Sequence, residues 1–184
     1  MRIVLVGISC VGKTTIGQVL AQTLGFAFID FDHEVEAHFG CGLGTVKKRF
    51  LTPASFRHAT GPLLADCLAR HPDQGLVLAS CPSGLHAPYY RFLRRASATV
   101  VALTDSPENI LKRLSFFDDH GRPIAVPLTP AALTYYRTDI RKDLAYFGRF
   151  YRKADLHFDV SGATPVDAAA RLGISLRIPF RTGA

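Results

Sequence analysis

Residues 3–15 read IVLVGISCVGKTT, an apolar run followed by a glycine-rich turn and the first residues of a helix. The turn fits the pattern G-x-x-x-x-G-K-[ST], with Gly7, Gly12, Lys13 and Thr14 at its four defining positions. Glycines allow successive backbone N–H groups to converge on phosphate oxygens, and the following helix adds the positive end of its dipole. Lys13 can reach the β- and γ-phosphates, and the Thr14 hydroxyl can bind Mg²⁺. The stretch therefore predicts a nucleotide-phosphate site formed by Gly7, Ser9, Cys10, Val11, Gly12, Lys13, Thr14 and Thr15.

Length and composition indicate one globular domain that covers residues 1–184. Of the 184 residues, 48% are hydrophobic and 20% are charged, which is typical of a protein with one substantial core. No apolar run approaches the length of a membrane span, and the run before Gly7 is too short for a signal peptide. We therefore expect a cytoplasmic monomer without membrane association. The cysteines show no metal-ligand spacing and are expected to be reduced: Cys10, Cys41, Cys67 and Cys81.

The net charge of +7 favours anionic partners, which include nucleotide phosphates, an acidic metabolite and nucleic acid. Basic residues alternate with aromatic residues between positions 135 and 153, a mixture that also occurs where proteins stack on bases. The aromatic residues recur at helical spacing, however, and this favours a core-facing stripe. We therefore do not expect nucleic-acid binding.

Short apolar runs alternate with helical patterns along the chain. Strands are expected at residues 3–6, 26–29, 75–79, 98–103 and 156–160, and helices at 16–24, 35–39, 51–70, 106–114, 136–151 and 164–172. Gly61-Pro62 should kink or split the third helix, and residues 176–178 are a candidate edge strand. The apolar runs are continuous, which suits parallel strands covered on both faces. The pattern predicts an α/β fold, a doubly wound parallel sheet of about five strands with helices on both faces.

Ligands of such sheets bind beyond the carboxyl ends of the strands. Gly7, Asp30, Asp32 and Ser80 follow expected strands and should meet at that edge.

The longest distinctive pattern runs from Gly12 to Asp32 and reads GKTT-x-G-x-x-LA-x-x-LG-x-x-F-x-D-x-D. With the later pairs Val35-Glu36 and Phe56-Arg57, it resembles the shikimate kinase family of P-loop kinases. The resemblance extends from Ile3 to about residue 172. It implies a kinase that uses ATP and Mg²⁺ to phosphorylate a hydroxyl of shikimate or a related hydroxy acid.

The resemblance also implies roles for residues around the acceptor. Asp32 matches the carboxylate that holds the acceptor hydroxyl and can act as its base. Asp30 matches the carboxylate that reaches Mg²⁺ beside Thr14. Arg57 matches the arginine that grips the carboxylate of the substrate, a bidentate task for which a guanidinium is suited.

A lid is implied at about residues 113–128. Arg122 matches the lid arginine that folds over the ATP phosphates and acts in catalysis with Lys13 and Asp32. Arg113 lies at the start of the lid and is expected to bind the nucleotide. Residues 158–165 resemble the segment that borders the adenine.

The acceptor half departs from the family pattern. The family has three glycines after the third strand, whereas this chain has Ser80-Cys81-Pro82-Ser83-Gly84, and Thr60 stands where a glutamate is expected. The position of the second substrate arginine falls on Tyr146 or Phe147, with Arg149 or Arg141 nearby. We expect Ser80 and Arg149 to contact the substrate.

Two other functions remain open from the sequence. One is a kinase of another polyol or of a nucleotide hydroxyl. The other is a kinase-derived regulatory protein that binds nucleotide with little turnover.

Overall fold

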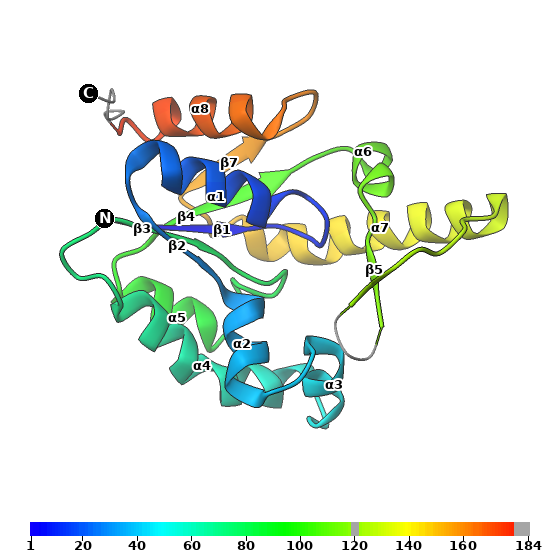
Figure 1. Cartoon of the computed structure of the whole chain (residues 1–184), viewed down its shortest axis with the longest axis horizontal. Coiled ribbons are helices and arrows are strands. Elements are labelled where there is room, and N and C mark those ends of the chain that lie inside the picture. The colour runs from blue at the N-terminus through cyan, green and yellow to red at the C-terminus, as the bar shows by residue number, and fades with distance from the viewer. Residues whose placement is uncertain (119–121, 179–184) are drawn as a thin grey trace.

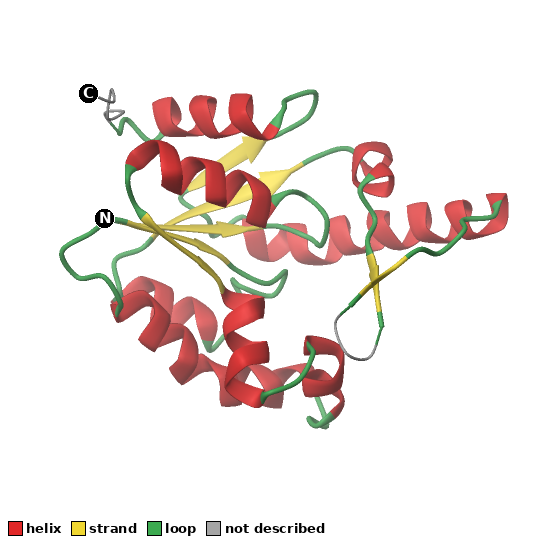
Figure 2. Cartoon of the chain, viewed as in Figure 1, coloured by secondary structure: helices red, strands yellow, loops and turns green. Residues whose placement is uncertain are grey.

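The computed structural model describes residues 1–118 and 122–178, and a parallel sheet lies at its centre (Figures 1 and 2). Its five strands lie in the order β2-β3-β1-β4-β7, and every neighbouring pair is parallel. A two-stranded antiparallel hairpin, β5 and β6, stands apart from the sheet. The strands are β1 (Arg2–Val6), β2 (Ala27–Asp30), β3 (Leu76–Ala79), β4 (Thr99–Thr104), β5 (Phe116–Phe117), β6 (Pro123–Ile124) and β7 (Leu156–Asp159). The predicted doubly wound α/β fold is confirmed.

Helices cover both faces of the sheet, which explains why β1 and β3 are buried almost throughout. α1 and α8 pack together on one face, and α4 and α5 pack together on the other (Figure 1). The helices are α1 (Lys13–Leu24), α2 (Phe31–Phe39), α3 (Leu43–Lys48), α4 (Pro53–Ala69), α5 (Tyr89–Arg95), α6 (Pro107–Lys112), α7 (Pro130–Tyr151) and α8 (Pro165–Ser175). Within the described residues, we find no helix with the length and apolar character that crossing a membrane requires.

The strand order positions the site. β1 lies between β3 and β4 in the sheet. The chain segments that follow neighbouring strands run to opposite faces here, so a crevice forms beyond the carboxyl end of β1. Gly7 follows β1, Asp30 ends β2 and Ser80 follows β3. The three residues therefore come to one edge of the sheet, as the sequence predicts.

α4 is one helix from Pro53 to Ala69, so of the two outcomes expected at Gly61-Pro62 the split does not occur. A Cβ on Gly61 would lie 2.7 Å from the Phe92 ring of α5, which shows that the α4–α5 packing uses this glycine. Residues 176–178 form a hydrogen-bonded turn after α8 and not an edge strand. The rest of the tail, residues 179–184, lies outside the described residues.

Candidate active site

The phosphate loop joins β1 to α1 and has backbone angles that favour glycine. Gly7 has φ +155°, and a Cβ there would lie 2.8 Å from the carbonyl oxygen of Leu103. Gly12 has φ +107° and precedes α1 in a left-handed conformation. The Lys13 ammonium donates to the carbonyl oxygens of Gly7 at 3.0 Å and Ile8 at 2.9 Å. The loop therefore curls around its own lysine, in the shape that a phosphate cradle requires.

The other loop residues differ in exposure. Ser9 and Thr15 are exposed, while Cys10 is half-buried and has φ +61°. The Val11 side chain is completely buried in the core, so Val11 can contribute to a nucleotide site only through its backbone.

A hydroxyl and a carboxylate meet where α1 begins and β2 ends. The Thr14 hydroxyl donates to Oδ2 of Asp30 at 2.6 Å, and Oδ1 of Asp30 accepts from the Asp32 backbone at 3.0 Å. The second bond caps α2 and fixes the carboxylate. Two hard oxygen donors fit Mg²⁺, which commonly takes one or two protein ligands and completes its sphere with phosphate and water. In residues 1–118 and 122–178, no cluster of three or more acidic, histidine or cysteine side chains offers an alternative metal site.

Asp32 lies in the first turn of α2, close to Lys13. Burial raises the pKa of the Asp32 carboxyl, while Lys13 and Lys47 oppose the shift. Burial likewise lowers the pKa of the Lys13 ammonium, and the negative charge of Asp32 opposes that change. The charge of each group therefore opposes the pKa shift that burial causes in the other.

A cavity of about 430 Å³ opens beside Asp32. Two of its lining residues, Lys47 of α3 and Cys81, interact electrostatically with Asp32, so the carboxylate lies close to the cavity. Arg57 of α4 also lines it, and its Nε donates to the Ala87 carbonyl oxygen at 3.3 Å. The full lining is Lys47, Phe50, Leu51, Thr52, Pro53, Phe56, Arg57, Cys81, Pro82, Ser83, His86, Asp143, Tyr146 and Phe147.

The expected lid contains the β5–β6 hairpin, which projects away from the sheet beside the first turns of α7 (Figure 1). Arg122 is exposed, and its Nε donates to Oδ2 of Asp118 at 2.8 Å. Arg113 forms a short ion pair with the buried Asp105. Burial would raise the pKa of the Asp105 carboxyl, but hydrogen bonds from Asn109, Arg113 and Ser161 lower it. Residues 119–121 of the expected lid lie outside the described residues.

The comparisons with known proteins decide the family. The family model described as "Shikimate kinase" matches residues 9–173. The chain belongs to the shikimate kinase family. Members of this family use ATP.

Curated shikimate kinases give the same answer. The enzyme of Bordetella avium is 35% identical over 130 residues, which cover 71% of this chain and 59% of that enzyme. This match therefore spans about three fifths of the relative's length. The enzyme of Limosilactobacillus fermentum is 31% identical over 180 residues, 97% of this chain and 96% of that one. The solved structure of the Acinetobacter baumannii shikimate kinase in complex with shikimate is 28% identical, with a TM-score of 0.75. That match covers 96% of this chain and 93% of the other.

The loop after β3, where family members carry glycines, turns Ser80 inward. The Ser80 side chain is buried, and its Oγ has no hydrogen-bond partner within the described residues. A Cβ on Gly84 would lie 2.7 Å from this oxygen. Ser80, expected to contact the substrate, is not among the residues that line the cavity, whereas Cys81 and Ser83 are.

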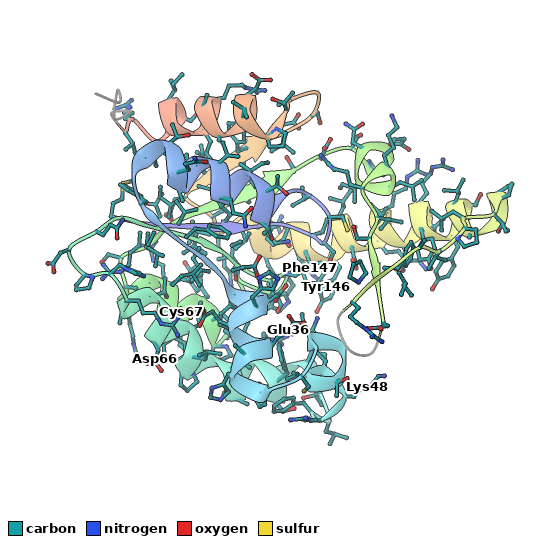
Figure 3. All side chains as sticks on the ribbon, viewed as in Figure 1. Glu36, Lys48, Asp66, Cys67, Tyr146 and Phe147 are labelled. Atoms are coloured by element: carbon teal, nitrogen blue, oxygen red, sulfur yellow. The ribbon has the colours of Figure 1, made fainter. Side chains whose placement is uncertain are left out.

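The family's second substrate arginine has no counterpart on the cavity side of α7. Tyr146 and Phe147 occupy the two positions at which the sequence places the family's second substrate arginine. Both line the cavity, and Figure 3 labels both side chains. Arg149 does not line it; its guanidinium lies 4.5 Å from the centre of the Tyr146 ring, and its Nε donates to the Tyr146 carbonyl. Arg141 pairs with Glu108 of α6. The structure therefore does not bring Arg149 to the cavity.

Sequence reasoning missed Lys47, His86 and Asp143. Lys47 belongs to α3, a helix of six residues that is too short to give a periodic signal. His86 lies in the irregular stretch before α5. Asp143 could have been found, because it lies three and four residues before the two aromatic positions and so shares their helix face.

Proposed function

We propose that the chain is an ATP-dependent kinase that transfers the γ-phosphoryl group to a hydroxyl of shikimate or a related hydroxy acid. The observation that carries the proposal is the meeting of donor and acceptor features around Asp32. Lys13 of the phosphate loop interacts with this carboxylate, and so do Lys47 and Cys81, which line the same cavity as Arg57. Membership of the shikimate kinase family supports the same reaction.

The donor half binds ATP through the loop and α1. Backbone N–H groups of residues 9–15 and the Lys13 ammonium hold the phosphates, so Lys13 exchanges its bonds to the Gly7 and Ile8 carbonyls for bonds to phosphate. Thr14 and Asp30 hold Mg²⁺, which supplies charge neutralisation on the phosphate oxygens when bound. Arg122 reaches the same phosphates after the lid closes, and closure excludes water from the transfer. Arg113 serves this half indirectly, because its pair with Asp105 fixes the end of α6 from which the lid starts.

The acceptor half orients a hydroxyl toward the γ-phosphorus. Asp32 accepts the hydroxyl proton as the new O–P bond forms and the bond to the β-phosphate oxygen breaks, which releases ADP. A carboxylate with a raised pKa binds a proton more tightly than an ordinary aspartate does. Asp32 is therefore a stronger base toward the acceptor hydroxyl. Arg57 binds the carboxylate of the hydroxy acid with its terminal nitrogens.

We also propose that the protein is a cytoplasmic monomer.

A coupled ADP-release assay tests the reaction. Shikimate, quinate and simple polyols are compared with an ATP-only background, and Asp32→Asn serves as the inactive control because it keeps the shape of the side chain. Isothermal titration of ATP, with and without Mg²⁺, is run in parallel. Tight ATP binding without phosphorylation of any hydroxy compound would refute the kinase and leave a nucleotide-binding regulator.

A further inference from the structure

The α7 wall of the acceptor cavity presents one carboxylate and two aromatic rings. Asp143, Tyr146 and Phe147 stand three and four residues apart, so they share one face of the helix. Figure 3 labels the two rings, which lie on the α7 side of the space between that helix and α2. This wall faces a cavity whose other side carries Arg57 and Lys47.

The Asp143 carboxylate lacks a counter-charge. It is half-buried, and no hydrogen bond or ion pair to another described residue holds it. Burial raises its pKa, and the negative charge of Asp139 raises it further. Its oxygens are not among the buried polar atoms that lack a partner, so water reaches them and a cation that enters the cavity can pair with them.

Three arginines of α7 contact partners outside the cavity. Arg137 and Arg141 both approach Glu108 on α6, at 3.7 and 3.4 Å. Arg149 stacks on the rings of Tyr146 and Phe150. The cations of the cavity therefore come from α3 and α4, opposite a wall with negative charge and π-electron density.

The chemistry of this wall suits an ammonium group. A carboxylate pairs with it directly, and ring faces attract it through their quadrupoles. His86 completes the aromatic surroundings: it is buried, its ring centre is 3.6 Å from that of Phe150, and burial lowers its pKa. A neutral imidazole adds no positive charge that would compete with an ammonium.

We propose that the acceptor is a hydroxylated acid that also carries a protonated amine. Arg57 and Lys47 bind its acid group, and Asp143, flanked by the rings of Tyr146 and Phe147, binds its ammonium. The proposal rests on the kinase function proposed above and narrows the acceptor class. A plain hydroxy acid would leave the Asp143 carboxylate with water alone as its partner.

Matched acceptor pairs that differ in one amine test the proposal. One pair is shikimate and its analogue with an amine in place of one ring hydroxyl; the other is 4-hydroxybutyrate and homoserine. In the ADP-release assay we expect at least one aminated member to have a Michaelis constant roughly tenfold or more below that of its partner, because a charged hydrogen bond is gained. Equal constants within both pairs, or tighter binding of the plain acids, would overturn the proposal and leave the kinase standing.

The variant Asp143→Asn locates the effect. It should raise the Michaelis constant of the preferred aminated acceptor roughly ten- to a hundredfold and change that of its plain partner by less than about threefold. Asp139→Asn is the matched control, since Asp139 is an exposed carboxylate one turn earlier and does not line the cavity. An equal effect of Asp143→Asn on both members of a pair would assign the residue a structural role and refute the proposal. If no compound of either kind were phosphorylated, the kinase function itself would fail.

Discussion

Replacement of Arg57 by alanine should weaken acceptor binding far more than ATP binding. The Nε of Arg57 is already bound to the Ala87 carbonyl, so the two terminal nitrogens remain for the carboxylate of the acceptor. Hydrogen bonds to a charged group contribute about 1.5–3 kcal/mol, which corresponds to roughly ten- to 150-fold in affinity. Because Arg57 is half-buried and partly screened by water, we expect the lower part of that range, about ten- to thirtyfold.

The assay is steady-state ADP release with one substrate varied at a time. Arg57→Ala should raise the Michaelis constant of the acceptor about ten- to thirtyfold and that of ATP by less than about twofold. Arg94→Ala is the matched control, because its exposed guanidinium pairs with Asp155 and does not line the cavity. An unchanged acceptor constant, or an equal rise for ATP, would refute the assignment of Arg57 to the acceptor.

Three further changes test other parts of the structure. Lys13→Ala should abolish ATP binding in calorimetry while circular dichroism stays native; retained Mg²⁺-dependent binding would contradict the phosphate-loop assignment. The turnover number should fall as pH drops through the raised pKa of Asp32, because the base is then protonated; a profile that stays flat down to the ordinary aspartate range near 3.8 would argue against this base. Gly61→Ala should lower the free energy of unfolding by about 1–3 kcal/mol, because the new methyl group clashes with an α5 ring. Gly44→Ala in α3 is the control, since its methyl group meets open space. Equal free energies of unfolding for the two variants would contradict the α4–α5 packing.

The sequence was sufficient to predict the sheet and the shape of the phosphate loop. Continuous apolar runs predict buried parallel strands, and the spacing of Gly7, Gly12 and Lys13 predicts the loop that the structure shows. The motif predicts a metal-binding role for Thr14, and the family resemblance implies one for Asp30; in the structure the two side chains are hydrogen-bonded to each other.

The acceptor half was harder to predict because tertiary packing forms it. The inward orientation of Ser80 depends on its close approach to Gly84, which no local pattern reveals. Arg149 was expected at the substrate, but stacking on Tyr146 takes its guanidinium elsewhere. Lys47 lies in a short helix that gives no periodic signal, and it is far along the chain from the phosphate loop. No local pattern therefore predicts that it lines the cavity.

The walls of the acceptor cavity come from three separate segments: residues 47–57, 81–86 and 143–147. The phosphate loop and the Thr14–Asp30 pair lie on none of them. A side chain on α7 can therefore be exchanged without disturbing a single hydrogen bond of the donor half. In an enzyme with this division, acceptor preference and phosphoryl chemistry can be altered independently. Redesign of α7 at positions 143, 146 and 147 is thus a direct route to new acceptors with ATP handling preserved.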